Sequence, residues 1–273
     1  MKKSFPFSYY GGKQNLLPEL LPLIPKHVQY CEIFAGGAAL FWAKHPSENE
    51  VISDINGNIT NFYMQLKTNF DMLQKLIQGS LHSELLHQQT SEILYKEDED
   101  PVIRAWALWY QANCSFGHII DGGFAFGTTG SGLATANKRD DFTQKFADRL
   151  RKVEIFNRSA IDMLELKDHP DTFFYIDPPY VSSDCGSYKG YTMDDFTELL
   201  QKLKTTKSKF LLSSYPEKAL MQYREECGWN SKDIKQVVLI SGKRKETKYK
   251  TECLTYNYPN PSNQISMFDI YNL

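Results

Sequence analysis

The most distinctive chemistry in this 273-residue chain belongs to the run Asp177-Pro178-Pro179-Tyr180. It directly follows the apolar segment 173–176, whose composition predicts a strand that ends in a rigid loop. The carboxylate and the prolyl carbonyls accept hydrogen bonds, and neither proline has an N–H to donate. Such a loop can hold a planar group with an exocyclic NH2, because the acceptors take its two hydrogens while the tyrosine ring stacks on its face. Alone, the run is also compatible with a Pro-Pro turn beside an incidental acid.

A second segment has the order strand, glycine turn, helix, which opens many nucleotide-binding α/β units. Residues 28–34 predict the strand, and Gly36 and Gly37 allow the backbone to approach a ligand closely. The next predicted strand, 51–53, ends in Asp54, where an acid can bind a ribose diol. The Gly-Gly-Ala-Ala spacing does not fit the Gly-x-Gly-x-x-Gly fingerprint, which argues against a nicotinamide dehydrogenase. Alone, this segment is also compatible with an ordinary tight turn and a solvated aspartate.

A third segment, Tyr9-Tyr10-Gly11-Gly12-Lys13, lies near the N-terminus and precedes a leucine-rich stretch. It is not a P-loop, because neither Ser nor Thr follows the lysine. Taken by itself, it predicts a plain turn with an exposed lysine.

In this order, the three motifs resemble those of the DPPY-type DNA N6-adenine methyltransferases, the Dam-like class. That family carries an aromatic-x-Gly-Gly-Lys segment, a Phe-x-Gly-x-Gly turn preceded by an acid, a strand-ending Asp, a target-recognition insert and then Asp-Pro-Pro-Tyr. The matching parts here are 9–13, 32–37, Asp54 and 177–180, and residues 157–162 resemble the segment that closes over the cofactor adenine. The resemblance spans most of the chain.

The resemblance implies an enzyme that transfers a methyl group from S-adenosyl-L-methionine to adenine N6 in double-stranded DNA after base flipping. The catalytic residues that it implies are Asp177, Pro178, Pro179 and Tyr180. The cofactor-binding residues that it implies are Tyr9, Tyr10, Gly11, Gly12, Lys13, Glu32, Phe34, Ala35, Gly36, Gly37, Asp54, Ile55, Ser159, Ala160 and Asp177. The chain departs from the family pattern with Tyr9 in place of Trp, Ala38 in place of glycine and Ser159 in place of Asp.

The expected mechanism follows from the weakness of the nucleophile, because the lone pair of adenine N6 is delocalised into the ring. The methyl donor already carries a good leaving group, so neither a metal nor a covalent nucleophile is required. If Asp177 and the Pro178 carbonyl accept the two N6 hydrogens, they orient the lone pair and stabilise the developing positive charge. The sequence leaves open whether Asp177 also removes a proton.

Two other classes of function are compatible with parts of the sequence. One is an amino-methyltransferase that acts on cytosine N4, RNA or a protein amide, although such relatives more often have Ser or Asn at the position of Asp177. The other is a catalytically silent DNA-binding subunit of a modification complex, against which the intact tetrapeptide argues. Binding of the cofactor distinguishes the second class from an enzyme.

The fold expected from these motifs is α/β, with a Rossmann-like methyltransferase sheet that carries helices on both faces. Residues 1–57 and 146–273 are predicted to form the catalytic domain, and residues 58–145 a mostly helical target-recognition insert. Within the insert, helical spacing of apolar residues extends over 58–76 and 80–115. Residues 116–127 predict a β-hairpin with a glycine-rich turn, and the polar stretch 128–138 predicts a loop.

Charge is distributed unevenly, although the formal net charge is only −2. Residues 202–250 contain eleven Lys and two Arg against four Glu and one Asp. They include a predicted basic hairpin loop, 243–248, between the strand-like runs 236–240 and 253–258, and contact between this loop and DNA phosphates is expected. The predicted DNA-binding residues are His118, Asp121, Lys138, Arg139, Lys243, Arg244, Lys245 and Lys248.

Composition fits a globular enzyme, since 41% of the residues are hydrophobic. The longest uncharged apolar-rich stretch, 33–43, is too short to span a bilayer, and residues 1–7 lack the apolar core of a signal peptide. The five scattered cysteines include no Cys-x-x-Cys pair and predict free thiols without a zinc site. These features favour a cytoplasmic protein without membrane association. The resemblance implies double-stranded DNA as its partner and allows a cognate restriction enzyme as a further partner.

Overall fold

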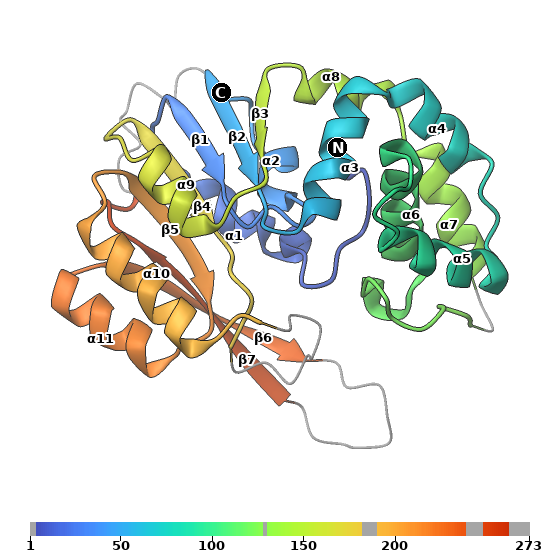
Figure 1. The fold of residues 1–273 in the computed structure, drawn as a ribbon. Coiled ribbons are helices and arrows are strands. Elements are labelled where there is room, and N and C mark those ends of the chain that lie inside the picture. The colour runs from blue at the N-terminus through green and yellow to red at the C-terminus, as the bar shows by residue number, and fades with distance from the viewer. Residues whose placement is uncertain (1–3, 128–129, 182–189, 239–247, 262–273) are drawn as a thin grey trace, which may run out of the picture. The chain divides into compact units, whose positions relative to one another are not determined.

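The computed structural model describes residues 4–127, 130–181, 190–238 and 248–261 (Figure 1). The strands of this part of the chain are β1 Gln29–Glu32, β2 Asn49–Ser53, β3 Val153–Phe156, β4 Thr172–Ile176, β5 Lys209–Ser214, β6 Asn230–Val238 and β7 Lys248–Tyr256. The helices are η1 Lys13–Leu16, α1 Leu17–Leu20, η2 Leu21–Leu23, α2 Ala39–Ala43, α3 Gly57–Thr68, α4 Phe70–Gln78, α5 Glu84–Leu94, α6 Pro101–Cys114, η3 Phe116–His118, α7 Ser131–Asp140, α8 Gln144–Leu150, α9 Ala160–Leu166, α10 Met193–Thr205 and α11 Lys218–Cys227.

The chain divides into two compact units. Unit 1 comprises Met1–Leu17 and Ala35–Ser159, and unit 2 comprises Pro18–Phe34 and Ala160–Leu273. All of the predicted insert, 58–145, lies within unit 1. The predicted catalytic run 177–180 lies within unit 2.

Unit 2 is built on strands in the order β1-β4-β5-β7-β6. The β1–β4 and β4–β5 pairs are parallel, and β7 runs antiparallel to both of its neighbours. Every residue of β4 is buried, which explains its continuous apolar sequence, because a central parallel strand is covered on both faces. Helices α9, α10 and α11 pack side by side over one face of these strands (Figure 1). This arrangement confirms the predicted Rossmann-like α/β class.

The sequence Thr192-Met193-Asp194-Asp195 predicts a capping box at the start of a helix, and the structure confirms it. Thr192 and Asp195 form a capping box at the start of α10, with the Asp195 backbone N–H donating to the Thr192 hydroxyl at 3.2 Å and the Thr192 N–H donating to the Asp195 carboxylate at 2.6 Å. Strands β6 and β7 pair antiparallel, with Val238 opposite Lys248, as a hairpin requires, although β7 begins at Lys248 and not at the predicted residue 253. Lys243, Arg244 and Lys245 lie outside the described residues.

Unit 1 joins a parallel strand pair, β2 with β3, to the helices of the insert. Helix α6 is central among them and packs against α3, α4, α5 and α7. It is therefore buried almost all round, and Trp109 at its middle is fully buried and donates to the Pro6 carbonyl at 2.9 Å. Phe7, from the N-terminal segment, packs its ring edge-on against Phe62 of α3, with ring centroids 4.7 Å apart.

The structure corrects three expectations for the insert. The helical stretch 58–76 is two helices, α3 and α4, separated at Asn69. The hairpin expected at 116–127 is one antiparallel bridge, Ser115 with Phe124, because left-handed backbone at Gly117, His118 and Asp121 turns the chain before a ladder can extend.

The third correction concerns the loop predicted over 128–138, where residues from Ser131 onward form helix α7. Tertiary contacts stabilise this helix. Thr135 is buried, and its hydroxyl lies 2.9 Å from Nδ1 of His82 and 3.6 Å from the Cys114 sulfur. These partners lie outside the helix, so its polar sequence alone does not predict that it forms.

Within the described part of the chain, no helix has both the length and the apolar character needed to cross a membrane.

Candidate active site

The glycine turn of unit 1 is shaped by the ring of Tyr9. Gly36 has φ +43°, and a Cβ at this position would lie only 2.7 Å from Cε1 of Tyr9. A Cβ on Gly37 would lie 2.8 Å from Cβ of the same tyrosine. Both glycines are therefore required by close approach of the predicted cofactor-binding tyrosine. Ala38 itself adopts a left-handed conformation, with φ 47° and ψ 45°, so the backbone accepts a Cβ where the family pattern has glycine.

We expect Gly36→Ala to destabilise the protein by about 1–3 kcal/mol, because the new methyl group adds a clash with Tyr9 to an unfavourable φ. Gly123→Ala is the matched control, since a Cβ there would meet nothing within 4 Å. The control should change stability by no more than about 0.5 kcal/mol. Urea unfolding of the three proteins measures the difference, and equal losses in both variants would contradict the role assigned to the turn.

Asp54 is held in place at the end of β2 by two backbone donors. The Gly36 N–H donates to Asp54 Oδ2 at 2.8 Å, and the Asn56 N–H donates to Oδ1 at 2.9 Å. Burial raises the pKa of Asp54 above its ordinary value, while these two donors oppose the rise. This aspartate is thus part of the turn structure and not a freely solvated side chain.

Two side chains that the sequence did not single out support this turn. The Tyr63 hydroxyl, from α3, donates to the Gly36 carbonyl at 2.8 Å. The Asn157 side-chain amide donates to the carbonyls of Asp54 and Ile55 at 2.8 and 3.0 Å. In the sequence, Tyr63 is one of the apolar residues at helical spacing, and Asn157 is the first residue of the segment 157–162. These partners are far apart in the sequence, so no local pattern indicates them.

The N-terminal motif forms a compact loop rather than a turn with an exposed lysine. The Gly12 N–H donates to the Tyr9 carbonyl at 3.1 Å, and Gly11 has a left-handed φ of 71°. Lys13 is only 8% exposed, and its ammonium donates to the Gly11 carbonyl at 3.2 Å. Burial of a lysine beside a backbone carbonyl argues against the simple solvated turn.

In unit 2, the predicted catalytic run follows β4 directly, and its acid and its tyrosine approach one another. The Tyr180 hydroxyl lies 3.3 Å from Asp177 Oδ1, and Pro178 between them is buried. The same hydroxyl is 3.3 Å from the Ser213 hydroxyl of β5 and makes a short hydrogen bond to Glu252 of β7. Three strands of unit 2 therefore converge on Tyr180.

Electrostatics keep the phenols of this region neutral. Burial raises the pKa of Tyr180 well above its ordinary value, and the charges of Asp177 and Glu252 raise it further. The pKa of Tyr175 in β4 is shifted in the same direction, first by burial and then by the charges of Asp177, Glu32 and Glu252. The Tyr180 hydroxyl therefore keeps its proton and can donate it to an acid beside it.

A second aromatic residue, Tyr215, lies beside the predicted catalytic run 177–180. Its ring centroid is 4.2 Å from that of Tyr180, with the ring planes inclined by 54°. The Lys250 ammonium sits 5.2 Å from the centroid of the Tyr215 ring, within the range of a cation–π contact. Neither residue belongs to a motif that the sequence presents.

The other residues predicted in unit 2 occupy defined positions around β1 and α9. Glu32 is buried at the end of β1, where its carboxylate accepts from the Tyr30 hydroxyl at 2.6 Å. The ring of Phe34 packs edge-on against Tyr191, with centroids 5.9 Å apart. Ala160 is the first residue of α9. Its neighbour Ser159 is the last residue of unit 1.

The residues predicted to bind DNA fall into three groups. His118 and Asp121 both have left-handed φ values of 62°, and the Asp121 carboxylate accepts hydrogen bonds from Ser91, at 3.1 Å, and from Tyr95. Arg139 in α7 donates to the Ser80 carbonyl at 2.5 Å, while Lys138 beside it is half-buried.

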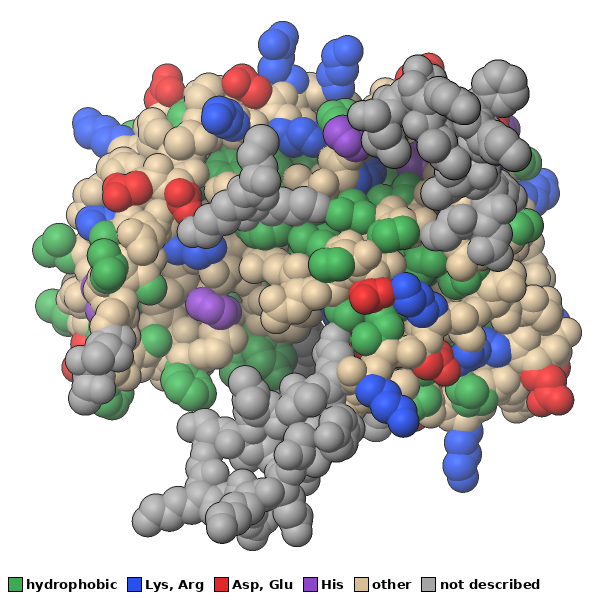
Figure 2. Space-filling model, turned by 180° about the vertical axis from the view of Figure 1, so that it is seen from behind, with side chains coloured by type: hydrophobic (Ala, Val, Ile, Leu, Met, Phe, Trp, Pro, Cys, Tyr) green, Lys and Arg blue, Asp and Glu red, His purple; other side chains and the backbone are tan. Residues whose placement is uncertain are grey.

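The third group is the basic loop, of which Lys248 opens β7 and the other members lie outside the described residues. On the face drawn in Figure 2, the described Lys and Arg side chains are interspersed with Asp and Glu. The described part of that face therefore does not by itself mark where DNA binds.

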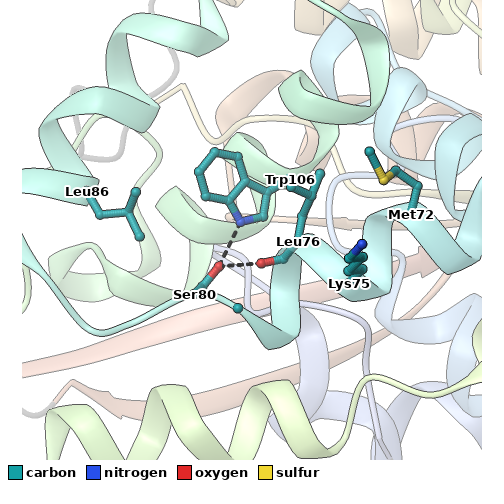
Figure 3. Close-up of a pocket in the computed structure, with 7 residues that line it drawn as sticks. Met72, Lys75, Leu76, Ser80, Leu86 and Trp106 are labelled. Atoms are coloured by element: carbon teal, nitrogen blue, oxygen red, sulfur yellow. Dashed lines mark hydrogen bonds between the residues drawn. The ribbon is translucent and has the colours of Figure 1, made fainter.

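A pocket of about 360 Å³ lies elsewhere in unit 1, where α4, α5 and α6 meet (Figure 3). Trp106 donates through Nε1 to the Ser80 hydroxyl at 2.7 Å, and that hydroxyl donates to the Leu76 carbonyl at 2.9 Å. The residues that line the pocket are Met72, Lys75, Leu76, Gly79, Ser80, Leu86 and Trp106. None of them is among the predicted site residues.

Residues 9–253 match the family model of the D12 class N6 adenine-specific DNA methyltransferases, and the chain belongs to this family. The chain is thus an adenine-specific DNA methyltransferase, as the motifs implied.

Three relatives place the chain among proteins of DNA modification. It is 26% identical to the type II methyltransferase M1.LlaDCHI of Lactococcus lactis subsp. cremoris over 221 residues, which cover 70% of this chain and 72% of the relative. It is 27% identical to the type II methyltransferase M.CviBI of Paramecium bursaria Chlorella virus NC1A over 213 residues, with coverages of 74% and 79%. The modification methylase LlaI of Lactococcus lactis subsp. lactis is 26% identical over 257 residues, which cover 84% of this chain and 40% of the relative.

Proposed function

We propose that the chain uses S-adenosyl-L-methionine as its methyl donor and that residues 177–180 present the N6 amine of a flipped adenine. The observation that carries this proposal lies in the loop after the buried strand β4. There the Tyr180 hydroxyl oxygen is 3.3 Å from Asp177 Oδ1. Such a loop provides a hydrogen-bond acceptor and an aromatic face side by side, as recognition of an aminated ring requires.

Unit 1 offers the groups that fit the cofactor. The Asp54 carboxylate, oriented by two backbone N–H groups, can accept from the hydroxyls of a ribose. Ile55 next to it is 73% exposed and offers an apolar surface for an adenine ring. The glycine turn beside Tyr9 brings backbone close to whatever binds there. When bound, S-adenosyl-L-methionine supplies an electrophilic methyl group, and these residues hold it in place.

In unit 2, Asp177 and the Pro178 carbonyl accept the two hydrogens of the adenine amine. This fixes the direction of the nitrogen lone pair and places negative charge where positive charge develops. Tyr180 provides the stacking surface for the flipped base. Because its hydroxyl is anchored, the ring is held in place before the base arrives, and such stacking is worth about 1–3 kcal/mol per base.

Substrate recognition is assigned to the insert and to the basic loop. We propose that residues 58–145 form the target-recognition insert and that segment 116–138 reaches base edges in the major groove. Lys243, Arg244, Lys245 and Lys248 would contact phosphates, which position the protein without carrying sequence information.

This division of roles gives a test by salt dependence. Replacing Lys243, Arg244 and Lys245 together with glutamine should weaken binding about equally on cognate and non-cognate duplexes. It should also flatten the dependence of log K on log salt by roughly 0.9 for each phosphate that the protein no longer neutralises. Substitution of His118 should instead reduce cognate affinity selectively and leave the slope nearly unchanged. An unchanged slope in the triple variant would remove the loop from the DNA interface.

We also propose a cognate restriction enzyme as a functional partner. The names of the relatives, which include type II methyltransferases and a modification methylase, support this role. If it is correct, DNA treated with the protein should resist one restriction endonuclease of matching site.

The experiment that tests the whole proposal treats unmodified DNA with the purified protein and S-adenosyl-L-methionine and maps N6-methyladenine along the sequence. A single recurring site is the expected result. Methylation of cytosine N4 instead, or of RNA in preference to DNA, would overturn the assignment of the substrate.

A further inference from the structure

We propose that Glu252 is a positioning residue that draws the Tyr180 hydroxyl proton away from Asp177. This inference rests on the proposed role of residues 177–180. Glu252 lies in β7, 72 positions beyond Tyr180, and belongs to none of the motifs found in the sequence.

The geometry around the Tyr180 hydroxyl carries the proposal. A phenol has a single proton, and three acceptors among the described residues lie near it. Asp177 Oδ1 and the Ser213 hydroxyl are each 3.3 Å away, and the Glu252 Oε1 contact is the shortest of the three. Because hydrogen bonds to a carboxylate strengthen as they shorten, the proton is directed to Glu252.

Ser213 reinforces this direction. Its hydroxyl donates to the same Oε1 of Glu252 at 2.5 Å, so its own proton is used there. Glu252 is only 4% exposed, which prevents water from replacing these donors. A buried carboxyl group in a strand is costly unless hydroxyl or ammonium groups satisfy it, and Tyr180 and Ser213 do so.

Loss of Glu252 has a specific chemical consequence. The Tyr180 proton would turn to Asp177 Oδ1, the other carboxylate oxygen that the described residues place within hydrogen-bond distance. There it would compete with the adenine amine for the acceptor that orients N6. The expected defect is therefore in the methyl-transfer step and not in the affinity for DNA, which distinguishes this role from a merely structural one.

A double-mutant cycle tests whether Glu252 acts through the Tyr180 hydroxyl. Glu252→Ala is measured in the natural chain and in a Tyr180→Phe background, with kcat and KM for a cognate duplex as readouts. In the natural chain, kcat should fall roughly 10- to 100-fold, as expected for loss of a hydrogen bond to a charged acceptor, while KM changes little. In the Tyr180→Phe background, the same change should lower kcat by no more than about twofold, because no hydroxyl proton remains to be redirected.

Glu252→Gln keeps an acceptor oxygen in a side chain of nearly the same shape. It therefore serves as a second test if Glu252→Ala does not fold. Its kcat should lie between those of the natural chain and Glu252→Ala, and its effect should also vanish in the Tyr180→Phe background. Ser213→Ala is the matched control, since it removes the other donor to Oε1 while leaving the Tyr180 hydrogen bond, and it should cost less than Glu252→Ala.

Equal losses of kcat from the Glu252 variants in both backgrounds would overturn the inference. So would a defect confined to KM. The cycle is interpreted beside Asp177→Ala, which separates the role of Glu252 from that of the whole run. If Asp177→Ala is inactive and the cycle is additive, only the role of Glu252 falls. If Asp177→Ala stays active, the proposed function of the whole run falls.

Discussion

Asp177→Ala should lower methyl transfer by at least about 100-fold, the usual cost of removing one preorganised electrostatic partner of a reacting group. Asp177 directly follows the fully buried strand β4, and its Oδ1 lies 3.3 Å from the Tyr180 hydroxyl. Alanine removes the acceptor for one N6 hydrogen, so the lone pair is no longer aimed at the methyl group. The pairing of β4 with β1 and β5 is made by the backbone, so the protein should stay folded.

The measurement is the single-turnover rate of N6-methyladenine formation with saturating cofactor. Asp171→Ala is a suitable control, because Asp171 is an exposed acid next to the first residue of the same strand β4. Thermal unfolding of both variants verifies that they are folded. Near-natural turnover in Asp177→Ala would show that the catalytic assignment is wrong.

Asp54→Ala should weaken binding of S-adenosyl-L-methionine by about 1.5–3 kcal/mol, the typical contribution of a hydrogen bond to a charged group. The substitution also removes the acceptor for the Gly36 and Asn56 N–H groups, so the turn beside Tyr9 loses a constraint. Calorimetry gives the affinity directly. Glu48→Ala serves as the control, since Glu48 is an acid beside the opposite end of β2. If Asp54→Ala and the natural chain bind the cofactor with equal affinity, Asp54 stabilises only the turn and does not bind the cofactor.

The pH dependence of this binding provides an independent check. The ionised carboxylate is the form that accepts from ribose hydroxyls, and burial raises the pKa of Asp54 above its ordinary value. Affinity should therefore fall as the pH is lowered through the raised pKa, beginning above the usual aspartate range near about 3.9. Asp54→Asn should remove this part of the pH dependence. A natural chain whose affinity stays flat over that range, relative to the Asn variant, would contradict the assignment.

Local sequence patterns were sufficient to predict most of the strands around the motifs. The run 173–176 predicted β4 because a strand buried on both faces must be apolar throughout. The capping box at 192–195 and the basic hairpin were predicted because their signals are local in the chain. The family followed from motifs whose chemistry is carried by neighbouring residues, such as the acid and the two prolines of 177–180.

Tertiary structure decided what local patterns cannot encode. Helix α7 forms where a polar loop was predicted, because Thr135 finds partners on α6 and at His82. Arg139, which is predicted to bind DNA, donates to the Ser80 carbonyl, a contact between residues 59 positions apart that no local pattern indicates. The Glu252 carboxyl group contacts Tyr180, 72 positions away, because β7 pairs with β5 beside the predicted catalytic loop. Hydrogen bonds between distant strands depend on register, and register is fixed only when the whole sheet has assembled.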